Sequence, residues 1–134
     1  MTALFMLDTD SVSFALRGEG HVAKRIVARK PSELAISSIT LAELKYGADR
    51  RKSRKLHHLI DVFASDVLVL PFDEGCASQF GRLASTLVAR GTPIGDFDTL
   101  IAAHAMHLGL TLVTNNTKHF AKVVGLKIDN WMQS

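Results

Sequence analysis

Carboxylates follow short apolar segments at several points of this sequence. In FMLDTDSV (residues 5–12), apolar residues lead directly into Asp8, and Asp10 stands two positions later. Glu43 follows the apolar segment LAISSI, and Asp96 and Asp98 stand together in PIGDFDTLIAAHA. A carboxylate at the end of a buried strand can act as a nucleophile that becomes phosphorylated, or it can help to hold a divalent metal ion.

Gathering several carboxylates into one place has an electrostatic cost. Two of them about 4 Å apart repel by roughly 1–4 kcal/mol at realistic dielectric constants. A fold keeps such a cluster when a cation neutralises it or when protons are shared. Donors that are all oxygens favour a hard ion, Mg²⁺ with Mn²⁺ as a substitute. The interpretation is a metal site made by Asp8, Glu43 and Asp98, with Asp96 as a candidate further ligand.

Zinc would require histidine or cysteine ligands. His104 and His107 lie one turn apart on a predicted helix, but the sequence offers no matching third ligand, and His57 and His58 stand beside a basic run. We therefore do not expect a histidine-based metal site.

Each acid also has a role that involves no chemistry. Asp8 or Asp10 could cap the helix that follows, and Asp10 is better placed to do so. The segment TLAE matches a capping box, in which Glu43 reaches back to the N–H group of Thr40. Both acids of GDFD fall in the first turn of a helix, where the helix dipole favours negative charge. These roles are compatible with a metal site at the same edge.

Apolar strands alternate with helices along the chain. The predicted strands cover residues 3–7, 34–39, 67–71, 110–114 and, as a small last strand, 126–128. The predicted helices cover residues 11–17, 21–29, 40–47, 53–65, 74–90, 96–108 and 117–122. This order indicates an α/β fold with a mostly parallel sheet covered on both faces, whose functional site lies beyond the carboxyl ends of the strands.

The composition is that of one compact domain over residues 1–134. The chain has a single cysteine, Cys76, so it can form no intrachain disulfide. It also has no apolar run long enough for a membrane span and no basic segment before its first apolar run. These features predict a cytoplasmic protein without a membrane partner.

The charge is mildly basic, with 16 Lys and Arg against 13 Asp and Glu. Five of the positive charges stand within six positions: Arg50, Arg51, Lys52, Arg54 and Lys55. Such a run is either a solvated helix end or a surface that binds the backbone of a nucleic acid.

Two other functions fit parts of the sequence. FMLDTDSV matches the D-x-D-x-[T/V] opening of haloacid dehalogenase-type phosphatases, in which Asp8 would be the nucleophile. A Gly95-Asp96 pair, Thr114 and Lys118 add to that match, but that family places its lysine before the Gly-Asp motif. The second alternative is a protein-binding module without catalysis, in which the acids only cap helices.

Motifs from end to end resemble those of the VapC toxins, small ribonucleases of the PIN-domain family. They are MLDTD, ISSITLAELKYGA, GTPIGDFDTLIAAHAMHLGLTLVTNNTKHF and GLKIDNW, in this order. The resemblance implies a three-layer α/β/α sandwich and Mg²⁺- or Mn²⁺-dependent cleavage of RNA, with a tRNA loop as a plausible target. It also implies a homodimer and inhibition by a VapB-type antitoxin. Apolar helix surface at 26–27 and 56–63 is either core or a seat for a partner helix.

The resemblance also assigns roles to residues. Asp8 and Asp98 correspond to metal ligands, and Glu43 corresponds to the acid after the second strand. We expect Asp8 and Asp98 to hold Mg²⁺ with support from Glu43, while Asn116, together with Thr114, orients the attacking water or a phosphate oxygen. Asn116 stands where many members have a fourth acid, so the predicted site carries less negative charge than theirs.

Overall fold

The computed structural model describes residues 3–133. Within them, five short strands form one sheet in the order β3-β2-β1-β4-β5, and every neighbouring pair is parallel. The strands are β1 (Phe5–Leu7), β2 (Leu34–Ser37), β3 (Leu68–Leu70), β4 (Thr111–Val113) and β5 (Ile128–Asp129). Because all strands run in one direction, their carboxyl ends meet at one edge of the sheet, as the sequence predicts.

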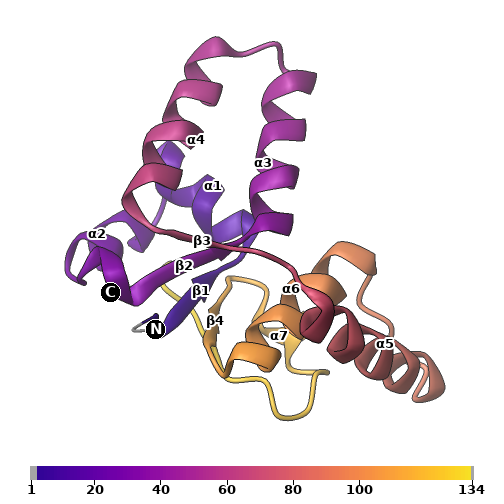
Figure 1. Cartoon of the computed structure of the whole chain (residues 1–134). Coiled ribbons are helices and arrows are strands. Elements are labelled where there is room, and N and C mark those ends of the chain that lie inside the picture. Colours follow the sequence, from indigo (N-terminus) through magenta and orange to yellow (C-terminus); the bar gives the residue numbers. More distant parts are fainter. Residues whose placement is uncertain (1–2, 134) are drawn as a thin grey trace.

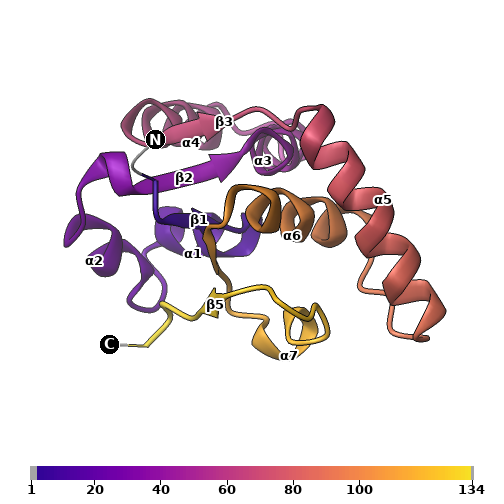
Figure 2. The ribbon, with the colours of Figure 1, turned by 60° about the horizontal axis from the view of Figure 1, so that its bottom comes forward.

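Helices connect the strands and cover both faces of the sheet. They are α1 (Thr9–Arg17), α2 (Val22–Val27), α3 (Ser38–Arg50), α4 (Arg54–Asp66), α5 (Glu74–Ala89), α6 (Asp96–Leu108) and α7 (Thr117–Phe120), with a 3-10 turn at Pro31–Glu33. Helices α3 and α4 form a hairpin that projects away from the sheet, whereas α5 and α6 lie side by side near its other end (Figures 1 and 2).

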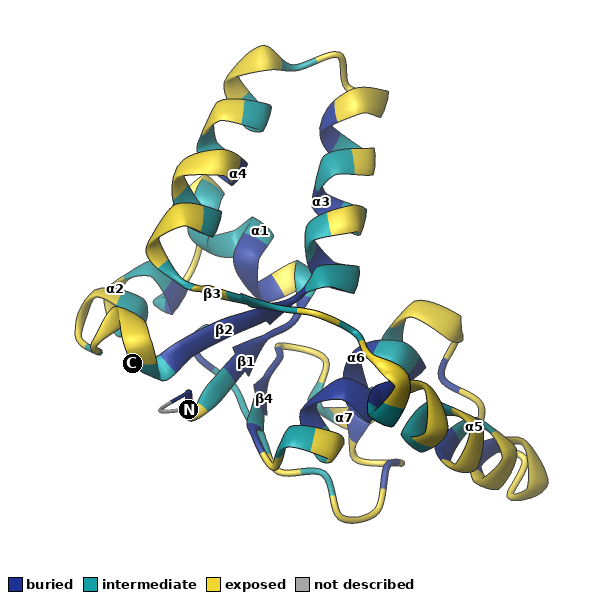
Figure 3. Cartoon of the chain, in the orientation of Figure 1, coloured by how far each residue is buried: buried dark blue, intermediate teal, exposed yellow. Residues whose placement is uncertain are grey.

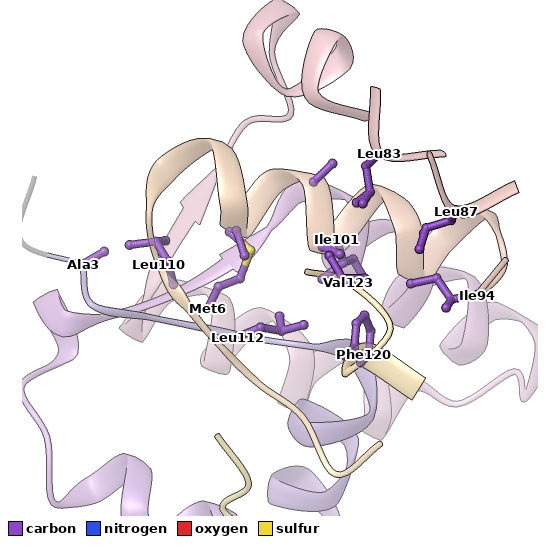
Figure 4. Packing of buried hydrophobic residues seen from close by; sticks show 14 residues of the cluster. Ala3, Met6, Leu83, Leu87, Ile94, Ile101, Leu110, Leu112, Phe120 and Val123 are labelled. Carbon is purple, nitrogen blue, oxygen red and sulfur yellow. The ribbon is translucent and has the colours of Figure 1, made fainter. Parts of the chain in front are cut away.

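Successive strand residues point into two different cores, since side chains alternate along a strand. Met6 and Leu112 pack with residues of α5, α6 and α7, such as Leu83 and Phe120 (Figure 4). Their neighbours in the strands, Leu7 and Val113, pack instead with residues of α1 to α4. Strands β1, β2 and β4 are therefore largely buried on both faces (Figure 3), whereas the edge strand β3 is partly exposed, and the three-layer α/β/α sandwich is confirmed.

Several predicted element boundaries were wrong; for example, α1 begins at Thr9 rather than near residue 11, and α2 and α7 end at Val27 and Phe120 rather than at residues 29 and 122. Helix α3 begins at Ser38 rather than Thr40, because the Ser37 hydroxyl accepts a hydrogen bond from the N–H group of Ile39 and caps the helix. The helix continues past Gly47 to Arg50. The last strand lies at Ile128–Asp129, a little later than the predicted 126–128. None of these differences changes the order of the elements.

No helix in the described part of the chain combines the length and the apolar character needed to cross a membrane.

Candidate active site

Asp8 follows β1 at the carboxyl edge of the sheet and is almost entirely buried, with 4% of its surface exposed. Its Oδ1 accepts a hydrogen bond of 2.8 Å from the N–H group of Ser11, so it caps α1. Burial raises the pKa of Asp8 to about 6, although hydrogen bonds from Thr114 and Ser11 act in the opposite direction. Asp8 is thus both a helix cap and a carboxylate held in a place unfavourable to its charge.

Asp10 is not the cap that the sequence analysis favoured. It lies exposed in the first turn of α1, and its negative charge contributes to raising the pKa of Asp8, of Glu43 and of Asp98. The charge of Asp10 therefore acts on all three predicted ligands. Its position two residues after Asp8 was the only signal for this role in the sequence.

Glu43 does not close a capping box, because α3 starts before Thr40. Its Oε1 instead accepts a hydrogen bond of 2.6 Å from the Thr9 hydroxyl of α1. Burial is the main cause of its raised pKa, and the charges of Asp98 and Asp10 add to it. Glu43 is therefore held toward the start of α1 and shares an electrostatic environment with Asp98.

Asp98 lies in the first turn of α6, and burial and the charge of Asp10 raise its pKa. His119 of the segment after β4 opposes this shift, since its Nε2 lies 3.1 Å from Asp98 Oδ2. The same nitrogen lies 2.7 Å from the carbonyl oxygen of Ile94, to which it can donate a hydrogen bond. The sequence analysis did not single out His119, because nothing in its local pattern relates it to Asp98.

Two other predicted site residues lie at the periphery. Asp96 is exposed in the first turn of α6, and no contact links its side chain to the acids described above. Asn116 is also exposed; its backbone N–H group donates to the hydroxyl of Thr114 at 3.0 Å, next to the hydrogen bond that Thr114 makes with Asp8. The side chain of Asn115 bonds instead to Asn130, at 3.2 Å.

Thr9 and Glu43 line two hollows. A groove of about 190 Å³ runs between α1, α3 and α4, and its walls include Leu56 and Ile60 from the apolar surface predicted at 56–63. A wider hollow of about 550 Å³ is lined by Thr9, Glu43 and the aromatic residues Tyr46 and Phe97. The aromatic side chains of Tyr46 and Phe97 are 63% and 55% exposed.

The basic run lies at the turn between α3 and α4. All five of its residues, Arg50, Arg51, Lys52, Arg54 and Lys55, are exposed. The turn forms the free end of the projecting hairpin (Figure 1), roughly 18 Å along α3 from the sheet edge at a rise of about 1.5 Å per residue. Arg51 also lines the groove that leads back to Glu43.

The carboxylate cluster, defined here as Asp8, Asp10, Glu43 and Asp98, fits a hard divalent ion. Its donor atoms are all oxygens. Burial raises the pKa of three of its four acids, Asp8, Glu43 and Asp98, and a bound cation would lower these pKa values again. Among the described residues 3–133, no three of these four acids each have a carboxylate oxygen within 4.8 Å of the other two. Ligation of one ion by these residues would thus involve movement of side chains or bridging waters.

Comparisons with known proteins agree with this arrangement. The PIN domain family model matches residues 5–126. The tRNA(fMet)-specific endonuclease VapC of Shigella flexneri is 36% identical over 128 residues, which cover 95% of this chain and 97% of that protein. Ribonuclease VapC2 of Rickettsia felis is 35% identical over 131 residues, covering 96% of this chain and 98% of that protein.

Solved structures give the same result. The crystal structure of VapBC2 from Rickettsia felis, bound to a DNA fragment from its promoter, superposes with a TM-score of 0.86 at 34% identity. DNA-bound VapBC from Salmonella typhimurium also gives a TM-score of 0.86, at 38% identity. Each of these matches covers 96% of this chain and 98% of the other.

These similarities extend over nearly the whole chain, whereas the likeness to haloacid dehalogenase-type phosphatases rests on a few short motifs. The phosphatase alternative is therefore not favoured. The parallel sheet and the acids at its carboxyl edge agree with these similarities. The chain therefore belongs to the PIN-domain family and is a ribonuclease of the VapC type, the toxin member of VapBC toxin–antitoxin pairs.

Proposed function

We propose that the carboxylate cluster is the catalytic centre of this ribonuclease and that it hydrolyses phosphodiester bonds of RNA with Mg²⁺, for which Mn²⁺ can substitute. The observation that carries this proposal is that acids of three elements distant in the sequence lie near one another. Glu43 of α3 accepts a hydrogen bond from Thr9, the residue after Asp8. The charges of Asp10 of α1 and Asp98 of α6 act on Glu43. Asp8, Glu43 and Asp98 would hold the ion. Asp96 takes no part, because nothing draws its exposed side chain toward the cluster.

Neighbouring groups of the chain hold one oxygen of each predicted metal ligand. Thr9 holds one oxygen of Glu43, the Ser11 N–H group holds one oxygen of Asp8, and His119 lies against one oxygen of Asp98. Thr114 also makes a hydrogen bond with Asp8. Mg²⁺ held there would supply Lewis-acid chemistry, activating water and neutralising charge on the scissile phosphate. We propose that Asn116, together with Thr114, orients the water or a phosphate oxygen, and we expect 3′-hydroxyl and 5′-phosphate products.

The substrate that fits is RNA with unpaired bases. Tyr46 and Phe97 offer exposed aromatic faces beside Glu43, and unpaired bases stack on such faces. The five basic residues at the α3–α4 turn would bind phosphates farther along the strand, which adds affinity without sequence choice. The Shigella flexneri relative is named for tRNA(fMet), and a tRNA loop is the substrate we propose here.

The regulatory partner that we propose is a VapB-type antitoxin. The groove between α1, α3 and α4 is lined mainly by apolar side chains such as Leu16 and Leu59, and it leads to Glu43. An apolar helix of the antitoxin could fill the groove, while a basic side chain reaches the carboxylates and competes with Mg²⁺. We further propose a homodimeric, cytoplasmic enzyme in which residues 1–134 form one nuclease domain.

The test is cleavage of an RNA mixture by the purified chain, followed by sequencing of the new ends. Wild-type chain with Mg²⁺ is expected to cut at defined unpaired positions, whereas chelation of the metal or the Asp8→Asn substitution is expected to abolish cleavage. Asp96→Asn is the matched control and should retain activity. Full activity of Asp8→Asn under chelation would remove the proposal. Thermal stability that does not change with Mg²⁺ or Mn²⁺ would instead favour a binding module without catalysis.

A further inference from the structure

A second group of metal-binding side chains lies away from the carboxylate cluster, where α5 meets α6. Asp73 precedes α5, Cys76 stands in its first turn, and His107 stands in the last turn of α6. One donor atom from each residue lies within 4.8 Å of the other two, and no other such group occurs within residues 3–133. The sequence analysis found no third ligand for His104 and His107; the fold supplies two beside His107.

The position of His107 depends on a glycine. A Cβ atom at Gly75 would lie 2.3 Å from His107 Nε2 and 2.5 Å from its Cε1. Any other residue at this position would displace the imidazole, so the absence of a side chain lets the ring lie directly against the first turn of α5. The ring is thereby held beside Asp73 and Cys76.

On the α5 side, a hydrogen bond joins the other two residues of the group, Asp73 and Cys76. Asp73 caps α5, since its Oδ1 accepts a hydrogen bond of 3.1 Å from the N–H group of Cys76. Cys76 is buried, with 1% of its surface exposed, whereas Asp73 and His107 are exposed. An ion could therefore enter from solvent past the carboxylate and the imidazole and reach the thiol behind them.

His104 provides an independent observation beside this group. It is fully buried one turn before His107 on α6, and its Nδ1 lies 2.7 Å from Ser37 Oγ. Its Nε2 is the one buried side-chain nitrogen or oxygen in the described residues without a hydrogen-bond partner. A buried polar atom without a partner commonly marks the place of a water or an ion.

The chemistry of the donors selects the ion. A thiolate, an imidazole and a carboxylate together are typical ligands of Zn²⁺ and are unlike the all-oxygen set that Mg²⁺ prefers. Bond lengths of about 2.0–2.3 Å to zinc place tetrahedral ligand atoms roughly 3.3–3.8 Å apart, so donor atoms that lie within 4.8 Å of one another would approach by up to about 1.5 Å. We propose that Asp73, Cys76 and His107 form a zinc-class metal site that ties α5 to α6, with a water in the remaining position.

The proposal can be tested with the full chain, freed of metal, by titration with Co²⁺ as a coloured probe and with Zn²⁺ as its competitor. We expect one Co²⁺ per chain, a thiolate-to-cobalt charge-transfer absorption, and displacement by Zn²⁺ with a rise in Tm. Cys76→Ser should abolish the charge-transfer band, and His107→Gln should weaken Zn²⁺ binding at least tenfold. Glu74→Gln is the matched control, a carboxylate in the same turn of α5 but outside the group.

Two further variants test whether zinc binds at this group rather than at the carboxylate cluster. Gly75→Ala retains all three ligands and favours the helix, yet it should weaken Zn²⁺ binding by displacing His107. Asp8→Asn should leave Zn²⁺ binding unchanged, because it alters only the carboxylate cluster. The proposal is overturned if the charge-transfer band does not appear, if Cys76→Ser and Gly75→Ala bind Zn²⁺ like the wild type, or if Asp8→Asn removes the binding. Circular dichroism of each metal-free variant verifies that it is folded.

Discussion

Asp8 combines two roles in one side chain. It caps α1 through the N–H group of Ser11, and it carries a carboxylate in a buried place. Asparagine caps helices about as well as aspartate. Replacing Asp8 by Asn therefore removes the buried charge while it retains the cap, and this separates the two roles.

The first prediction concerns the stability of the Asp8→Asn variant. The pKa of Asp8 is raised from 3.8 to about 6 on folding. The folded state therefore binds this proton more strongly than the unfolded state, so the free energy of unfolding falls as pH rises from about 4 to about 6 and remains low above that range. Without divalent metal at about pH 7, the variant should be more stable than the wild type by on the order of 1–3 kcal/mol.

Urea unfolding in the presence of a chelator measures this difference. At about pH 4, where Asp8 is largely protonated, wild type and variant should approach equal stability. An Asp8→Asn variant that is less stable than the wild type at about pH 7 would contradict the raised pKa.

The second prediction compares two exposed acids that each stand in the first turn of a helix. Asp10 acts electrostatically on Asp8, Glu43 and Asp98, whereas Asp96 does not contact them. Asp10→Asn should weaken Mg²⁺ binding by a few fold, because it removes negative charge from the cluster. Asp96→Asn should leave the Mg²⁺ affinity unchanged. The Mg²⁺ concentration that gives half-maximal cleavage measures the effect, and equal values for the two variants would exclude a special role for Asp10.

The sequence predicts which acids form the candidate site and that they bind a metal ion, but it does not predict their contacts. Asp8, Glu43 and Asp98 stand where strands and helices must bring them toward one sheet edge, and their residue type indicates a hard ion. The contacts of Glu43 with Thr9 and of Asp98 with His119 join positions far apart in the sequence. No spacing rule relates such positions, so only the fold could show them.

At the scale of elements, α3 shows how local signals compete. Thr40 and Glu43 match a capping box, yet Ser37 caps the helix earlier with its own hydroxyl. Gly47 resembles a helix end, yet the helix continues because Leu44 and Ala48 on either side of it are buried in the core. The alternation of strands and helices was predicted correctly, since it follows from apolar runs that are long compared with these single-residue signals.

The third prediction follows from two glycines inside helices. A Cβ atom at Gly47 of α3 or at Gly81 of α5 would meet nothing within 4 Å. Replacing either glycine by alanine should therefore raise the free energy of unfolding by about 0.5–1 kcal/mol.

The two positions differ in their surroundings, and this makes them a matched pair. Gly47 lines the groove between α1, α3 and α4, whereas Gly81 does not. Gly47→Ala should weaken binding of a VapB-type antitoxin, while Gly81→Ala should not. Calorimetric titration with the cognate antitoxin distinguishes them, and unchanged affinity for Gly47→Ala would argue against this groove as the binding site.

At the scale of the whole molecule, the basic turn and the carboxylate cluster occupy different places. The fourth prediction is that replacing Arg54 and Lys55 by Gln lowers the salt dependence of binding to a long single-stranded RNA. Each lost phosphate contact should reduce the slope of log K against log salt by about 0.7. Cleavage of an RNA only a few nucleotides long should not change.

A second double variant controls for net charge. Lys122 and Lys127 are exposed near the C-terminus and outside this turn, so replacing both by Gln removes the same charge from another surface. The slope should then remain at the wild-type value. If both double variants lower the slope equally, the effect reflects overall charge rather than a binding surface at the turn.

The α3–α4 hairpin has a consequence for how such enzymes diversify. Its free end carries the charge, while its other end adjoins the sheet (Figure 1), and Glu43 stands in the half of α3 nearer the sheet. On the role proposed for the basic turn in binding RNA, substitutions or insertions at the free end would change the reach and charge of the hairpin without reaching the sheet or Glu43. A lineage would thus acquire a new target RNA while it inherits its hydrolytic chemistry intact.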